Sequence, residues 1–98
     1  MRTPLVRLHV DAPCEIWLKL ENLQPIASFK IRGAANAVRS ADPAELEHGL
    51  VTASAGNMAQ GVAWIARELG LPATIAVPEH AFHQGIPDEA IGQRLICA

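Results

Sequence analysis

The hydrophobic and polar positions of the chain follow two different periods. Three short apolar runs, at 15–20, 50–53 and 73–77, are bounded by turn residues, as is typical of strands. Between these runs the apolar positions recur every three or four residues, which predicts helices over 29–39 and 58–69. Strands that alternate with helices indicate an α/β fold with short parallel strands and right-handed crossovers.

The predicted helices have clear apolar faces and end signals. The face of the first helix consists of Ile31, Ala34, Ala35 and Val38. The face of the second consists of Met58, Val62, Ile65, Ala66 and Leu69. Gly70 provides a natural end for the second helix. A short helix is expected after Asp42, because an Asp cap followed by Pro43 suits a first helical turn.

Composition narrows the classes of function. The chain has 98 residues, half of them hydrophobic, so it forms at most one small globular domain. A net charge of −2 offers no basic excess for a nucleic-acid backbone, and no nucleic-acid partner is expected. No apolar run approaches the roughly 18 residues of a membrane span, so no membrane partner is expected. Cys14 and Cys97 form no disulfide framework, which predicts a reduced, cytoplasmic protein with these cysteines as packing or terminal residues.

Metal binding is not expected either. Of the four histidines only His80 and His83 are closely spaced, and no cluster of cysteines or carboxylates supports them. Trp17 and Trp64 are interpreted as core or interface aromatics rather than as platforms for stacked bases.

Two segments carry candidate chemistry. In the segment over 28–34, SFKIRGA, a lysine stands beside an aromatic residue at a helix start, where it can form a Schiff base with a carbonyl cofactor. The segment over 52–61, TASAGNMAQG, joins a strand to a helix, and its small residues and free N–H groups suit a carboxylate or phosphate. Taken singly, each has an ordinary alternative: a solvated surface lysine, and a turn capped by Ser54 or Asn57.

Together these segments resemble a known family. KLENLQPIASFKIRGAANAV followed by TASAGNMAQGVA is similar in order and spacing to the serine/threonine dehydratases, which are pyridoxal-phosphate enzymes. The opening Thr-Pro-Leu and the later TIAVPE also look like family sequence, so the resemblance covers about residues 3–81. It implies part of the three-layer, tryptophan-synthase-β-like fold of fold type II, here truncated.

The resemblance also implies roles for individual residues. Lys30 matches the lysine that binds pyridoxal 5′-phosphate as a Schiff base and removes the substrate's Cα proton. Phe29 would pack near the cofactor ring, and Asn57 would donate a hydrogen bond to its 3′ oxygen. The loop that would bind the substrate carboxylate, mainly through backbone N–H groups, consists of Ser54, Ala55, Gly56, Asn57 and Met58.

The reaction implied is β-elimination from a small β-hydroxy amino acid, L-threonine or L-serine, to a 2-oxo acid and ammonia. Ala55 stands where related serine racemases carry a serine that acts as acid and base, and an alanine cannot transfer a proton. Met58 replaces a common histidine, which is compatible with a backbone role. Two other hypotheses stay open: a lyase of the same fold for another hydroxy amino acid, and a catalytically inactive or partner-binding α/β module.

Some family features have no counterpart in this sequence. A glycine-rich loop for the cofactor phosphate is absent, as is a later serine or cysteine facing the pyridine nitrogen. We therefore expect a single incomplete domain over 1–98, family-like to residue 81, with a divergent tail over 82–98 that includes helical turns over 88–95. A fragment, or a reading frame that diverges near Phe82, would explain this tail. Uncovered strand edges would favour association, such as a homo-oligomer, and impaired dehydratase activity.

Overall fold

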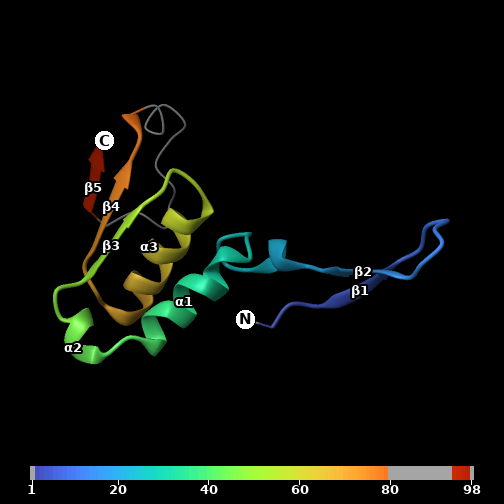
Figure 1. Cartoon of the computed structure of the whole chain (residues 1–98), viewed down its shortest axis with the longest axis horizontal. Coiled ribbons are helices and arrows are strands. Elements are labelled where there is room, and N and C mark those ends of the chain that lie inside the picture. The colour runs from blue at the N-terminus through green and yellow to red at the C-terminus, as the bar shows by residue number, and fades with distance from the viewer. Residues whose placement is uncertain (1, 80–93, 98) are drawn as a thin grey trace.

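The computed structural model describes residues 2–79 and 94–97. An antiparallel hairpin extends from an α/β unit that contains the helices and a parallel sheet (Figure 1). In chain order the elements are β1 (Leu5–Leu8), β2 (Ile16–Lys19), the 3-10 turn η1 (Glu21–Leu23), α1 (Lys30–Ser40), α2 (Pro43–Leu46), β3 (Leu50–Ala53), α3 (Asn57–Leu69), β4 (Ala73–Val77) and β5 (Arg94–Cys97).

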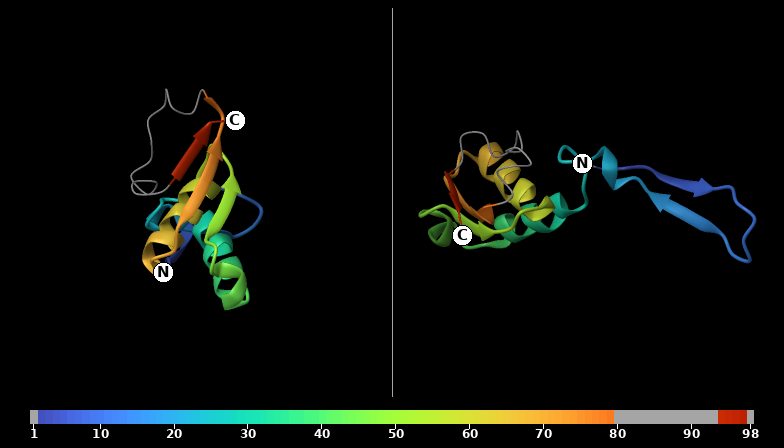
Figure 2. Two further views of the ribbon diagram at one scale, coloured as in Figure 1. Left: turned by 90° about the vertical axis from the view of Figure 1, so that its left-hand side faces the viewer. Right: turned by 90° about the horizontal axis from the view of Figure 1, so that it is seen from above.

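The parallel sheet has the order β3-β4-β5. Helix α3 packs against this sheet with one face and against α1 with another (Figure 2). On the sheet side, small residues let α3 approach β4, and the buried cluster consists of Ala59, Ala63, Ile75 and Val77. On the other side, Ala34 and Val38 of α1 pack against Ile65, which is fully buried. Helix α3 is therefore the central element of the core, as its two apolar faces require.

Most of the predicted elements are confirmed. The runs at 50–53 and 73–77 form adjacent parallel strands, and both long helices begin and end within one residue of the expected positions. Asp42 caps α2, its Oδ1 accepting a hydrogen bond of 3.0 Å from the Ala44 N–H. Gly70 ends α3 in the left-handed conformation, with φ of 66°.

Two strands differ from the sequence-based prediction. The run at 15–20 contains β2, which pairs antiparallel with β1 rather than joining the parallel sheet. Residues 94–95, expected in helical turns, lie in β5, where they pair with the otherwise open edge of β4. The rest of that predicted helix, 88–93, lies outside the described residues, as do His80 and His83.

Three residues for which a packing role was among the expectations are exposed. Trp17 is 51% exposed because it lies on the projecting hairpin, whereas Trp64 packs against the α1–α3 cluster as expected. Leu69 is 47% exposed at the last turn of α3, where the helix leaves the core. Cys14 is also exposed, as a free thiol, so it has no packing role.

The two long helices approach each other closely at Gly61. A Cβ built there would lie 3.2 Å from the Cβ of Ala34 and 3.4 Å from the carbonyl oxygen of Lys30. These separations are tighter than side chains usually make, so a Cβ at position 61 would require its neighbours to move by a few tenths of an ångström. The glycine thus places the first turn of α1 directly against α3.

Two glycine substitutions test this packing. We expect Gly33→Ala to raise the free energy of unfolding by about 0.5–1 kcal/mol, because glycine is unfavourable within a helix. No atom lies within 4 Å of a Cβ built at Gly33, so the added methyl group meets open space. Gly61→Ala should not increase the free energy of unfolding in the same way, because its added methyl group would crowd Ala34 and the Lys30 carbonyl of α1. Urea unfolding measures both, and equal stabilisation by the two variants would contradict the close crossing.

Candidate functional site

Lys30 is the first residue of α1, and the local structure fixes its backbone. Its N–H donates a 3.2 Å hydrogen bond to Oγ of Ser28, which is itself buried. Its amine lies 5.3 Å from the centre of the Phe29 ring, a separation at which a cation is attracted to the ring face. Phe29 is 60% exposed and Lys30 is partly exposed, so both residues can be reached from solvent.

The amine of Lys30 suits attachment of a carbonyl cofactor. Within the described ranges, no side chain forms an ion pair with its Nζ, and the contact that the amine does make is with the Phe29 ring. A lysine that reacts with an aldehyde must be both reachable and unoccupied. The predicted Lys30–Phe29 pair therefore fits the group that the sequence resemblance implies.

The second predicted segment lies just beyond the carboxyl end of β3. The N–H of Ser54 donates to the carbonyl of Ala76 at 3.0 Å, which continues the strand ladder by one residue. Oγ of Ser54 then accepts a 3.2 Å hydrogen bond from the Gly56 N–H, and α3 begins at Asn57. Ala55, Gly56 and Asn57 are exposed. Ligands bind at this end of the strands in open α/β sheets, and the first N–H groups of a helix have no partner within it.

Met58 has a different place from the rest of this loop. Its side chain is partly buried against the cluster formed by Ala34, Val38 and Ile65. A histidine there would have to place a polar ring in this apolar contact. The replacement of histidine by methionine is thus consistent with a packing role for the side chain and a backbone role in the loop.

The helix crossing brings the two predicted segments together. Gly61, one turn after Asn57, packs against the backbone carbonyl of Lys30. Both helices begin on the side of the hairpin and run next to each other (Figure 1). The first residue of α1, Lys30, therefore lies against α3 one turn after the loop ends.

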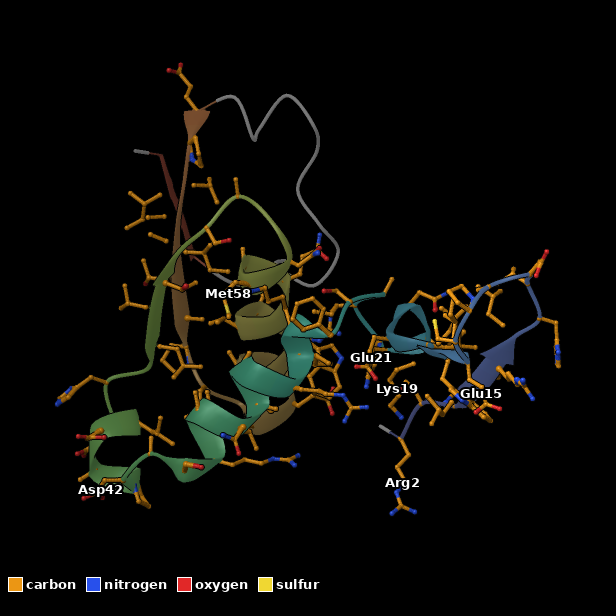
Figure 3. The ribbon with its side chains drawn as sticks, turned by 45° about the vertical axis from the view of Figure 1, so that its right-hand side comes forward. Arg2, Glu15, Lys19, Glu21, Asp42 and Met58 are labelled. Atoms are coloured by element: carbon orange, nitrogen blue, oxygen red, sulfur yellow. The ribbon has the colours of Figure 1, made fainter. Side chains whose placement is uncertain are left out.

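A polar junction that sequence analysis missed involves Arg32 in the first turn of α1. The carboxylate of Glu21 accepts two hydrogen bonds from Arg32, from Nε at 2.7 Å and from Nη2 at 2.8 Å. It also accepts from the Thr3 hydroxyl and, at 3.3 Å, from Nε2 of Gln24. The ammonium group of Lys19 donates to the carbonyl of Thr3. Figure 3 shows Lys19 and Glu21 close together where the hairpin meets the α/β unit.

The junction strongly favours the ionised form of the Glu21 carboxyl group. Hydrogen bonds from Arg32, and then from Thr3, lower the pKa of Glu21 from 4.5 to about 2. The carboxylate in turn raises the pKa of Arg32. The two side chains are eleven positions apart with a turn and a loop between them, so no helical or strand period connects them in the sequence. In the sequence, only the opposite charges of Glu21 and Arg32 within the family-like segment could have indicated that these two residues form an ion pair.

Two hollows formed by described residues have linings that do not include the lysine. One of about 270 Å³ has an apolar lining from α1, β3 and α3, including Gly33, Thr52 and Met58, but neither Lys30 nor Asn57. The described residues also contain no group of three or more side chains suited to a metal ion. The candidate residues at the starts of α1 and α3 include the exposed Phe29 and the exposed positions 55–57.

Comparison with known proteins identifies the family. The family model described as "Pyridoxal-phosphate dependent enzyme" matches residues 1–95. The chain belongs to the pyridoxal-phosphate dependent enzyme family. The expected resemblance, fold type and cofactor class are thereby confirmed at the level of the family.

Individual relatives agree with this assignment. The L-threonine ammonia-lyase of Thermotoga maritima is 55% identical over 67 residues, which cover 68% of this chain and 17% of the relative. The structure of maize serine racemase has a TM-score of 0.80 at 30% identity, covering 100% of this chain and 31% of that one. The crystal structure of the T.th. threonine deaminase also has a TM-score of 0.80, at 32% identity, covering 99% and 31%.

The chain spans about a fifth of the length of the curated relatives it matches. No helix in the described part of this family member is long and apolar enough to cross a membrane.

The lowered pKa of Glu21 predicts how stability depends on pH. The folded state keeps this carboxylate ionised down to about pH 2, whereas in the unfolded chain it binds a proton near its usual 4.5. The folded state thus binds fewer protons in this window, so the stabilisation by Glu21 is complete above it and is lost as the pH falls through it.

Urea unfolding of the wild type and of Glu21→Gln between pH 7 and pH 2.5 measures this effect. The wild type should be the more stable protein at pH 7, and its advantage should shrink as the pH falls. Glu15→Gln, which removes an exposed ion pair with Arg7 on the same hairpin, is the control for general acid effects. An advantage over Glu21→Gln that is independent of pH would contradict the ionised junction.

Proposed function

We propose that this chain supplies the cofactor-bearing lysine and the substrate-carboxylate loop of a lyase that acts on L-threonine or L-serine. The observation that carries the proposal is the contact of Gly61 with the Lys30 carbonyl, since it joins the start of α1 to the first half of α3. The accessible amine beside Phe29 supports it. The name of the Thermotoga maritima relative, L-threonine ammonia-lyase, supports the substrate class.

Each residue has a distinct task in this proposal. Lys30 provides the amine to which pyridoxal phosphate attaches, and it removes the Cα proton of the substrate. When bound, the cofactor supplies an electron sink for the resulting charge. Phe29 flanks the cofactor ring, and Asn57 donates a hydrogen bond to its 3′ oxygen. The substrate carboxylate is oriented by backbone N–H groups over Ser54, Ala55, Gly56, Asn57 and Met58.

Position 55 favours elimination over racemisation. The TM-scores to the serine racemase and to the threonine deaminase are equal, so the fold does not separate the two reactions. Racemisation needs a second proton-transfer group on the opposite face of the substrate. Ala55 is exposed in the loop and has no such group.

The isolated chain is proposed to turn over substrate poorly, because it spans only about a fifth of its relatives. Val51 is 82% exposed on β3, and the hairpin exposes Leu5 and Trp17, so apolar surfaces suited to association are uncovered. These surfaces support the alternative that the chain is an inactive, partner-binding module or a homo-oligomer. The exposed free thiol of Cys14 is compatible with a cytoplasmic location.

Cofactor labelling tests the proposal, because the chain has only two lysines. The purified chain is incubated with pyridoxal phosphate, reduced with borohydride and mapped by mass spectrometry. Lys30 should be labelled several-fold faster than Lys19, because the ammonium group of Lys19 already donates a hydrogen bond to the Thr3 carbonyl. Lys30→Ala is the control that should abolish the selective label, and Lys19→Arg should preserve it. Equal labelling of both lysines would contradict a cofactor site at Lys30.

The same preparation tests turnover. Release of ammonia and a 2-oxo acid from L-threonine should be far slower than the ~1–10³ s⁻¹ of ordinary enzymes. Turnover within that range by the pure chain would overturn the proposal of impairment, but not the assignment of Lys30.

A further inference from the structure

The Glu21 carboxylate lies where three separate segments of the chain meet. The Thr3 hydroxyl reaches it from the N-terminal segment, Gln24 from the loop that follows η1, and Arg32 from the first turn of α1. Thr3 and Gln24 are both buried. None of these side chains has a role in the proposed function. The junction therefore needs a separate explanation.

The Glu21–Arg32 ion pair closes a loop of chain that contains Lys30. One end of this loop is fixed because the N–H of Gln24 donates to the Glu21 carbonyl at 3.1 Å. The other end is fixed because Arg32, two residues after Lys30, binds the same Glu21 through its guanidinium group. The loop cannot shift along the hairpin without breaking contacts at both ends.

The interior of this loop is also constrained. Ile26 and Ser28 are buried, whereas Ala27 between them is exposed and has φ of 55°, a conformation that is costly for a residue with a side chain. The Ala27 N–H donates to the Gln24 carbonyl at 2.8 Å. Such strain persists only where the surroundings hold the backbone in place. The anchors at Glu21 supply that constraint immediately before Lys30.

The first turn of α1 is thus fixed on two sides. Gly61 of α3 meets the carbonyl of Lys30, and Glu21 binds the side chain of Arg32. Residues two apart on a helix point in directions about 200° apart, so the Arg32 contact leaves the amine of Lys30 clear. A guanidinium that binds both oxygens of a carboxylate fixes orientation as well as distance, which a lysine ammonium group does not.

We propose that Glu21 and Arg32 are positioning residues, whose two-fold hydrogen-bonded ion pair, supported by Thr3, sets the first turn of α1 so that the Lys30 amine is placed to receive the cofactor. This inference rests on the proposed function for the identity of the group that Lys30 receives. The position of the helical turn itself does not depend on that identity.

Three variants test the positioning role. Glu21→Gln removes the charge at similar size, Arg32→Lys keeps the charge but not the two parallel hydrogen bonds, and the double exchange Glu21→Arg with Arg32→Glu restores a pair. Glu15→Gln is the matched control, because it breaks a 3.2 Å ion pair with Arg7 in the same hairpin, away from Lys30.

The main readout is the rate at which pyridoxal phosphate labels Lys30, measured at a temperature where circular dichroism shows every variant folded. Glu21→Gln and Arg32→Lys should slow labelling about tenfold or more, as small misplacements of reacting groups do. The double exchange should recover part of the rate, and Glu15→Gln should label like the wild type. If Glu21→Gln lowers only the unfolding midpoint and the folded protein labels at the wild-type rate, the pair merely stabilises the fold and the proposal is overturned.

A second readout separates this proposal from the proposed function. Amide chemical shifts over residues 28–31, recorded without cofactor, should change in Glu21→Gln and not in Glu15→Gln. A wild type that fails to label Lys30 selectively would overturn the proposed function, while shift changes confined to Glu21→Gln would still support positioning. Unchanged shifts over 28–31 would overturn positioning whatever the labelling shows.

Discussion

The ion pair between Glu21 and Arg32 connects the two parts of this molecule. The hairpin of β1 and β2 extends away from the α/β unit, and most of its large apolar side chains are exposed (Figure 1). Apolar burial therefore contributes little to its attachment. The attachment consists of a carboxylate that receives hydrogen bonds from the N-terminal segment, the following loop and α1. The lowered pKa of Glu21 reflects the same contacts, since each favours the ionised form.

The second constraint is the close crossing of α1 and α3. Gly61 and Ala34 have little or no side chain, so the two helices can approach closely at this point. Ile65 packs into the interface one turn further along α3. The contact of Gly61 with the Lys30 carbonyl lies in the first half of α3 and at the first residue of α1, so it places the first half of α3 next to the lysine-bearing start of α1. Helix packing thus determines which residues can share the site, and the ion pair fixes the turn on which Lys30 stands.

Local sequence patterns predicted the elements whose partners are close in the sequence. The strands at 50–53 and 73–77 and the two long helices follow from apolar periods, because each buries the face that its own residues define. The patterns could not show that the run at 15–20 pairs with β1, since antiparallel pairing depends on a second strand with no distinctive alternation. They also placed Leu69 on a buried helix face and left open whether Trp17 lies in the core or at an interface, whereas both side chains are exposed. The motif resemblance located Lys30 and the 54–58 loop, but no pattern connected Thr3, Glu21 and Arg32, whose association exists only in three dimensions.

A double-mutant cycle on Glu21 and Arg32 tests most directly whether their ion pair attaches the hairpin to α1. The free energies of unfolding of the wild type, Glu21→Gln, Arg32→Gln and the double variant are measured in urea at pH 7 and low salt. The account predicts strong coupling: each single change destabilises the protein, and the double variant loses no more than the more damaging single change. Losses that simply add would show that the two side chains act independently, and would contradict the central role given to their interaction.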